Sequence, residues 1–294
     1  MKAEGRPIQW TSGQEQIKAS MDGWDVLGMV IGVFVLPDLR GTAEKAARIV
    51  ADLSPDLLLL NLPRDLNGMV AALARSGSLD DFREALRRYR VMPEPLDAWM
   101  YSLEPLLRMI GEVGEAFKVS CYYDSDFYFS DQALALAVAQ QTLRDSVTGR
   151  VEVRRWRGMM EESLRLRSKA IELNARFILE EARKSPEAIC ISGLDGPRME
   201  EILSQQCETT LEYLESPYFF TPLQQLETEM AAGDVEVERI ERLIDCHIQY
   251  IHEFVLTSES RDAAYSAWSR TMSERFTCEK LFLSELNRSI EGYP

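Results

Sequence analysis

Aspartate occurs in four short stretches of the sequence, three of which also carry arginine, and each stretch follows a short run of apolar residues. Carboxylates in such places can transfer protons or hold a metal ion, and arginines can bind an anionic ligand. The alternative interpretation is hydration, because the ends of buried strands meet water. The four stretches are 37–40 (PDLR), 61–65 (NLPRD), 124–126 (DSD) and 195–198 (DGPR).

Three aspartates are the candidate catalytic residues. Asp124 and Asp126 follow an apolar run that ends in two tyrosines, and side chains two apart on an extended segment share a face. They could form a carboxylate pair that faces a metal ion or a substrate, with Asp195 as the third candidate; the alternative is a hydrated loop. The candidate ligand-binding residues are Asp38, Asn61, Arg64, Arg165, Arg167 and Arg198.

Arg165 and Arg167 belong to a basic run, residues 152–169 (EVRRWRGMMEESLRLRSK), in an acidic chain. They could reach a small anionic ligand if one face of this helix points at the strand ends. The alternative is a solvated helix, because Glu161 lies four residues from both Arg157 and Arg165, the spacing of surface ion pairs.

The sequence offers little material for metal or nucleophilic chemistry. Its two histidines, His247 and His252, are five residues apart, which does not place them squarely on one helical face. The sequence contains no GxxxxGK[ST], GxGxxG or GxSxG motif. The five cysteines are irregularly spaced, which fits a reducing, cytoplasmic setting. We predict no metal site and no cofactor.

Short β-like runs alternate with longer helical ones through the first two-thirds of the chain. This pattern predicts an α/β fold with a mainly parallel sheet flanked by helices. Ligands bind outside the carboxyl ends of the strands in such sheets, so the four polar stretches are expected at one edge. The predicted strands are residues 30–36, 57–60, 118–123 and 188–194, with a fifth at 208–214.

The segments between the strands have helical periodicity. Thr42 is the predicted N-cap of the first helix, and prolines at 93 and 95 separate two later ones. A break is expected at Thr148 and Gly149. The predicted helices are residues 42–53, 66–74, 79–91, 96–117, 128–150, 151–184 and 197–206.

From about residue 216 the pattern is helical only, with apolar stripes at 237–255 and 264–290. Such stripes pack on the protein core or bury a partner, so we predict a protein partner or self-association through these helices. The expected organisation is an N-terminal segment (1–25), an α/β domain (26–215) and a helical C-terminal region (216–294).

Charge and hydropathy exclude two classes of partner. The net charge of −15 repels nucleic-acid backbones. The longest apolar run, residues 28–37, is far shorter than the roughly 20 residues that a membrane-spanning helix needs. The N-terminus lacks the apolar core of a signal peptide. We therefore expect a cytoplasmic protein that binds neither nucleic acid nor membrane.

Residues 30–66 resemble the opening of the TraB/erythromycin-esterase/ChaN-like superfamily, because VFVLP, GTAEKAARIVADLS and PDLLLLNLPRDL follow in that family's order. Residues 165–203 (RLRSKAIELNARFILEEARKSPEAICISGLDGPRMEEIL) resemble its unit of arginine, helix, strand and GxxH. The resemblance covers roughly residues 29–206. It implies an α/β fold with a cleft at the strand ends.

The polar residues of the family's hydrolase site are replaced in this chain. The first histidine falls on Pro37, the strand-end glutamate on Asn61, and the second histidine on Gly196 or, with a shift of one residue, Asp195. Neither proline nor asparagine can act as a base or a carboxylate. Arg64 and the pair Arg165 and Arg167 do match arginines of the family pattern.

Three functions are therefore weighed for this chain. The first is a binding or assembly protein that has lost metal- or His/Glu-dependent hydrolysis. The second is a hydrolase, with or without the assistance of a metal ion, that uses strand-end aspartates with Arg64 and Arg165. The third is a sensor of an anionic or nucleotide-like ligand that uses the arginines. The aspartates of the second hypothesis are Asp38, Asp124, Asp126 and Asp195.

Overall fold

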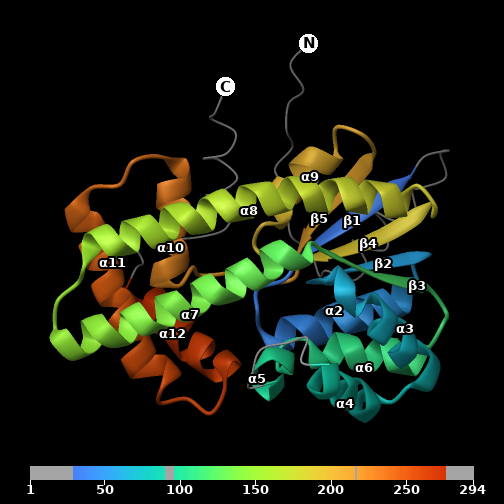
Figure 1. The fold of residues 1–294 in the computed structure, drawn as a ribbon, viewed down its shortest axis with the longest axis horizontal. Coiled ribbons are helices and arrows are strands. Elements are labelled where there is room, and N and C mark those ends of the chain that lie inside the picture. The colour runs from blue at the N-terminus through green and yellow to red at the C-terminus, as the bar shows by residue number, and fades with distance from the viewer. Residues whose placement is uncertain (1–28, 90–95, 216, 276–294) are drawn as a thin grey trace.

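The computed structural model of the chain describes residues 29–89, 96–215 and 217–275. A sheet with helices on both faces forms one part, and a long helical hairpin leads from it to a group of C-terminal helices (Figure 1). The predicted α/β fold class is confirmed. No helix among these residues is both long enough and apolar enough to cross a membrane.

The described strands form one sheet in the order β3-β2-β4-β1-β5, and every neighbouring pair is parallel. Each predicted strand is present, and β2 extends three residues beyond its predicted end. The strands are β1 (Val30–Val35), β2 (Leu57–Pro63), β3 (Lys118–Tyr123), β4 (Glu187–Ser192) and β5 (Glu208–Tyr213).

The central strands read as continuous apolar runs because helices cover both faces of the sheet. In β2, Leu57 and Leu59 pack into the cluster on one face, and Leu58 and Leu60 pack into the cluster on the other. All four leucines of this run are therefore buried, two on each face of the sheet.

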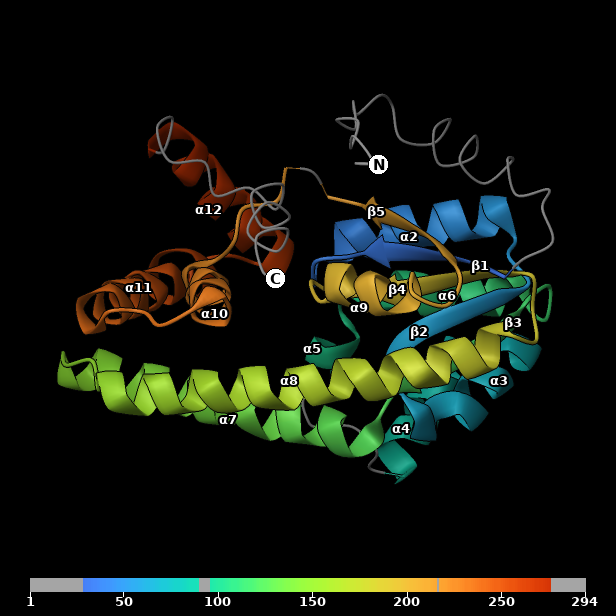
Figure 2. The ribbon, with the colours of Figure 1, turned by 90° about the horizontal axis from the view of Figure 1, so that it is seen from above.

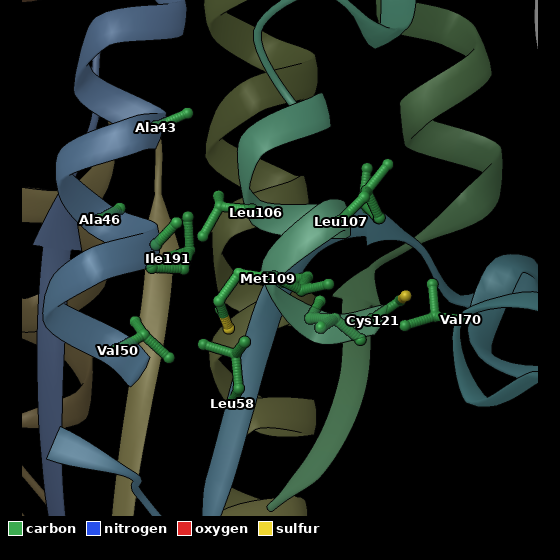
Figure 3. Close-up of a cluster of buried hydrophobic side chains, with 14 of the residues drawn as sticks. Ala43, Ala46, Val50, Leu58, Val70, Leu106, Leu107, Met109, Cys121 and Ile191 are labelled. Carbon is green, nitrogen blue, oxygen red and sulfur yellow. The ribbon is translucent and has the colours of Figure 1, made fainter. Parts of the chain in front are cut away.

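One face of the sheet is covered by the helices that follow β1 and β2. Side chains of α2 and α6 meet Leu58 and Ile191 there (Figure 3). A 3₁₀ turn, η1 (Arg64–Leu66), joins β2 to the first helix after it. The helices are α2 (Arg40–Leu53), α3 (Asn67–Ser76), α4 (Leu79–Tyr89), α5 (Leu96–Met100) and α6 (Glu104–Val113).

The opposite face is covered by α9 (Gly196–Leu203) and by the C-terminal half of α8 (Val153–Ala182). Helix α8 pairs with α7 (Ser125–Thr148) to form the long hairpin (Figure 2). Gly149 ends α7 with a φ of 64°, a left-handed conformation that favours glycine. The predicted break at Thr148 and Gly149 is confirmed.

The C-terminal helices pack against the far part of the hairpin and against the end of β1. Ile240 and Ile244 of the first predicted stripe lie in a cluster with Trp156 of α8. A second cluster joins Leu39, after β1, to Trp268. The elements are α10 (Pro222–Ala232), α11 (Val237–Tyr250), the π-helical turn η2 (Ile251–Val255) and α12 (Arg261–Arg275). Segment 1–25 and the second stripe beyond residue 275 lie outside the described residues.

The predicted N-cap of the first helix is wrong. Helix α2 begins at Arg40, and Thr42 lies buried in its first turn, donating hydrogen bonds to carbonyl groups of the preceding residues. The backbone N–H groups of Arg40 and Gly41 instead donate to the carboxylate of Asp262. A cap supplied from the other end of the chain leaves no local signal in the sequence.

The predicted helix over residues 96–117 is interrupted. Helix α5 ends at Met100, and α6 begins at Glu104. Pro105 lies in the first turn of α6, where its missing N–H removes no helical hydrogen bond. A continuous helix through this proline would have lost such a bond, which explains the break.

Candidate functional site

The carboxyl ends of β2, β3 and β4 line a small recess against α8. The helices after β2 cover one face of the sheet and the helix after β4 covers the other, so the recess lies at a topological switch point. Its volume of about 20 Å³ has room for about one water molecule. Polar side chains around it come from Asn61, Tyr123, Asn174, Ser192 and Asp195.

Asn61 lies in an irregular part of β2. The pairing register between β2 and β3 shifts there, between Leu60 and Pro63. The Oδ1 atom of Asn61 is buried and has no hydrogen-bond partner among the described residues. A buried amide oxygen without a partner costs roughly 1–3 kcal/mol. A single water in the recess would satisfy it.

Beside the recess, five ionisable side chains form what we call the Arg167 cluster: Tyr123, Asp131, Arg167, Asp195 and Glu227. Nε of Arg167 is 3.5 Å from Oδ2 of Asp195, and Nη2 is 3.3 Å from Oε2 of Glu227. The hydroxyl of Tyr123 donates to Oδ2 of Asp131. The cluster therefore joins β3, α7, α8, α10 and the start of α9.

Burial and mutual repulsion shift the proton affinities in the Arg167 cluster. Burial raises the pKa of Asp131, against the opposing effects of Tyr123 and Arg167. Burial also raises the pKa of Asp195, which Arg167 opposes and Glu227 reinforces. Burial alone would lower the pKa of Arg167, but the nearby carboxylates outweigh it and raise this pKa. Groups perturbed in this way are typical of functional sites and of structural ion-pair networks alike.

The charge of the Arg167 cluster disfavours an anionic ligand. Three carboxylates surround one guanidinium, and that guanidinium already contacts Asp195 and Glu227. An incoming anion would meet more negative than positive charge. The hypothesis that Arg167 binds a small anion therefore has no geometric support here.

Arg64 is held by the protein itself. Its Nε donates to the carbonyl of Tyr122 at 2.9 Å, and Nη1 lies 3.4 Å from Oδ2 of Asp124. The guanidinium also lies over the ring of Phe177, 4.3 Å from the centroid. Arg64 thus fastens η1 to the end of β3 and to α8.

The predicted pair of carboxylates after β3 is not formed. Asp124 is the N-cap of α7 and accepts hydrogen bonds from the backbone N–H groups of Asp126 and Phe127. Because α7 begins at Ser125, Asp126 lies in a helical turn and not on an extended segment, and its side chain is exposed. The two carboxylates therefore do not share a face.

The remaining candidates lie apart from the recess. Exposed Arg165 pairs with Glu162, and exposed Arg198 pairs with Glu201. The expected partner of Arg165, Glu161, was wrong by one residue. Arg157, the other expected partner of Glu161, contacts Asp234 instead. Asp38 is exposed and contacts Ser102 and Arg261.

The histidines and cysteines do not come together. Nε2 of His247 lies 3.2 Å from the hydroxyl of Thr142, and Nε2 of His252 lies 2.6 Å from that of Ser146. Cysteines 121 and 190 are buried, which raises the pKa of each thiol to about 12. Among the described residues, no three or more carboxylates, histidines and cysteines are grouped so that they could hold a metal ion.

Gly196, one of the positions matched to the family's histidines, has no room for such a side chain. A Cβ atom at Gly196 would lie 2.6 Å from Cγ2 of Val35, a distance that real contacts do not reach. Pro37 is buried. Of the matched positions, Asn61 and Asp195 line the recess.

Sequence reasoning missed Asp131 and Glu227. Asp131 lies seven residues, or about two helical turns, after Asp124, so its position follows once α7 is known to begin at Ser125. Glu227 has no comparable signal, because it reaches Arg167 from α10 in the C-terminal region.

Comparisons with protein-family models, with curated proteins and with solved structures found no match for this chain. The function must therefore be inferred from the site itself.

Proposed function

We propose that this chain is a cytoplasmic binding or assembly protein with an α/β fold, a divergent relative of the TraB/erythromycin-esterase/ChaN-like superfamily that has lost hydrolase activity. The observation that carries the proposal is that charged groups at the strand ends pair with one another. Arg64 contacts Asp124, Arg167 contacts Asp195, and the recess beside them holds about one water molecule.

Further contacts connect the helices that flank the sheet to the C-terminal part of the chain. Glu227 of α10 contacts Arg167 of α8, and Asp262 of α12 accepts hydrogen bonds from the first turn of α2. Lys45 of α2 contacts Glu215 beyond β5. Charged side chains thus hold distant elements of the fold together, which supports a scaffolding role.

A hydrolase is the second candidate because of one observation. Asp131 and Asp195 both lie beside Arg167 and both have raised pKa values, a condition that suits acid–base catalysis. The small recess counts against it, since drug-sized ligands occupy pockets of roughly 300–1,000 Å³.

Activity assays on matched variants separate the two candidates. The purified protein would be tested on chromogenic carboxylic esters, phosphate esters and glycosides, with and without added Mn²⁺ or Zn²⁺. We expect no turnover above the buffer rate, and none in Asp131→Asn or Asp195→Asn. Turnover that Asp195→Asn abolishes, and that the exposed-site control Asp126→Asn keeps, would overturn the proposal.

A further inference from the structure

Helix α7 carries an apolar stripe that the described part of the chain leaves uncovered. Four large apolar side chains are exposed along it, by 40% at Phe129, 61% at Leu136, 66% at Leu143 and 78% at Val147. Their spacings of seven, seven and four residues place them on one face of the helix. The stripe extends about 27 Å at 1.5 Å per residue.

The position of α7 makes this face available to a partner. Figure 2 shows α7 along one edge of the molecule, with no described element beyond its C-terminal half. Exposed Ala133 and Gln140 fill the places between the large side chains of the stripe. The stripe is therefore narrow, continuous and accessible.

The two helices of the hairpin differ in the composition of their outer surfaces. Residues 132–143 of α7 (QALALAVAQQTL) contain no charged residue. The outer surface of α8 carries exposed charges, among them Glu161 and Arg165. A helix that is apolar on its outer as well as its inner side is typical of a buried helix, so α7 resembles a helix with a second partner.

We propose that the α7 stripe binds the α7 stripe of a second copy of this chain, with the two helices antiparallel about a twofold axis. The inference rests on the proposed binding or assembly role and names its partner. In a homodimer one surface must complement itself, and a twofold axis across a helix makes the paired helices antiparallel.

The charges at the ends of α7 favour this arrangement. The exposed charged residue near its N-terminus is Asp126. The exposed basic residues near its C-terminus are Arg144, which lies 3.8 Å from Glu152, and Arg150. Antiparallel pairing brings the acidic end of one copy to the basic end of the other. With Leu136 on the axis, Phe129 of one copy meets Leu143 of the other, and Asp126 lies opposite the segment between the two arginines.

The size of the stripe sets the expected strength of the dimer. A helix face about 27 Å long and 10 Å wide is smaller than the roughly 800 Å² that each partner buries in a standard interface. We therefore expect a dissociation constant in the micromolar range, so that both species are present at workable concentrations.

Sedimentation velocity over a concentration series tests the proposal. The chain has a mass of 33.6 kDa, and we expect its sedimentation to move from monomer to dimer as the concentration rises through the micromolar range. Leu136→Glu combined with Leu143→Glu should remain monomeric throughout. The control Leu256→Glu, which changes a side chain 68% exposed outside α7, should dimerise like the wild type.

A charge exchange tests the antiparallel direction. Asp126→Arg should weaken the dimer by about tenfold, because it places like charges opposite each other. Adding Arg144→Asp and Arg150→Asp should restore wild-type affinity. A protein that stays monomeric at every concentration, a dimer insensitive to Leu136→Glu, or a charge exchange without rescue would overturn the proposal. Hydrolysis by a dimeric protein would overturn the proposed function instead.

Discussion

The carboxylate of Asp262 accepts a 2.9 Å hydrogen bond from the backbone N–H of Arg40, although the two residues are 222 positions apart in the chain. The same carboxylate accepts a 2.8 Å hydrogen bond from the N–H of Gly41. The first turn of α2, directly after β1, is thus capped by the first turn of α12. The C-terminal helices therefore lie beside the carboxyl ends of the strands, the edge at which ligands bind in parallel α/β sheets.

Removal of this cap should lower the stability of the folded protein. We expect Asp262→Ala to lower the free energy of unfolding by about 1 kcal/mol, because two N–H groups of α2 lose their acceptor. Urea denaturation monitored by circular dichroism measures the change. Exposed Glu259 lies in the preceding turn, and Glu259→Ala should leave the midpoint unchanged. Equal midpoints for both variants would show that the cap contributes nothing.

Arg64 and Arg165 are both candidate ligand-binding residues, but their substitution should have different effects. Arg64→Ala removes hydrogen bonds to backbone carbonyls and the contact with Phe177, so we expect a loss of about 2–3 kcal/mol in the free energy of unfolding. Arg64→Lys should recover little of it, since an ammonium group lacks the planar fork. Arg165→Ala removes only an exposed ion pair and should leave the urea midpoint in place.

Two glycines give a matched test of the packing between α9 and β1. Gly196→Ala forces a methyl group against Val35, and we expect a loss of about 1–3 kcal/mol in stability. Gly158→Ala adds the same methyl group within α8, where nothing beyond the adjoining residues and the backbone of the helix itself lies within 4 Å. That variant should gain about 0.5–1 kcal/mol from helix propensity. Thermal unfolding of both proteins measures the contrast, and a stable Gly196→Ala variant would contradict the close contact.

The stability of the protein should fall in weak acid because of His247. Burial lowers the pKa of His247 to about 4 from the 6.5 of an exposed histidine. As the pH falls, this histidine is protonated in the unfolded chain before it is protonated in the folded protein. The folded state therefore has its full stability above pH 6.5 and loses stability as the pH falls towards 4. A shift of this size corresponds to about 3 kcal/mol.

Comparison with His247→Gln isolates this contribution. The variant keeps a side chain that can hydrogen-bond to Thr142 but cannot take up a proton in this range. Urea midpoints at a series of pH values should fall less steeply for the variant than for the wild type between pH 6.5 and 4. Parallel curves would show that His247 is not buried in its neutral form.

The fold could be predicted from sequence because its signals are local. The four leucines of β2 and the apolar residues of β1 are each read from a few adjacent positions, and burial on both faces makes the runs continuous. The turn at Gly149 is equally local, since a left-handed residue needs glycine whatever surrounds it. The edge of the sheet that carries Asn61 and Asp195 followed from the same runs, although β2 extends three residues beyond its predicted end.

The partners of the polar side chains could not be predicted in this way. Arg167 meets Glu227 across 60 positions, and Arg64 meets Asp124 across a separation of the same size. A charged residue has the same sequence signal whether it faces water, as Arg165 does, or two partly buried carboxylates, as Arg167 does. The difference depends on which distant element packs beside it.

By itself the sequence determined an α/β protein with five strands, a helical C-terminal region and polar residues at one edge of the sheet. Only the tertiary structure decided what those residues do. It closed the space around Gly196, left the Oδ1 atom of Asn61 buried without a partner among the described residues, and placed Asp262 on the first turn of α2. The physical reason is that hydrophobic periodicity is set by neighbours along the chain, whereas ion pairs and hydrogen bonds are set by neighbours in space.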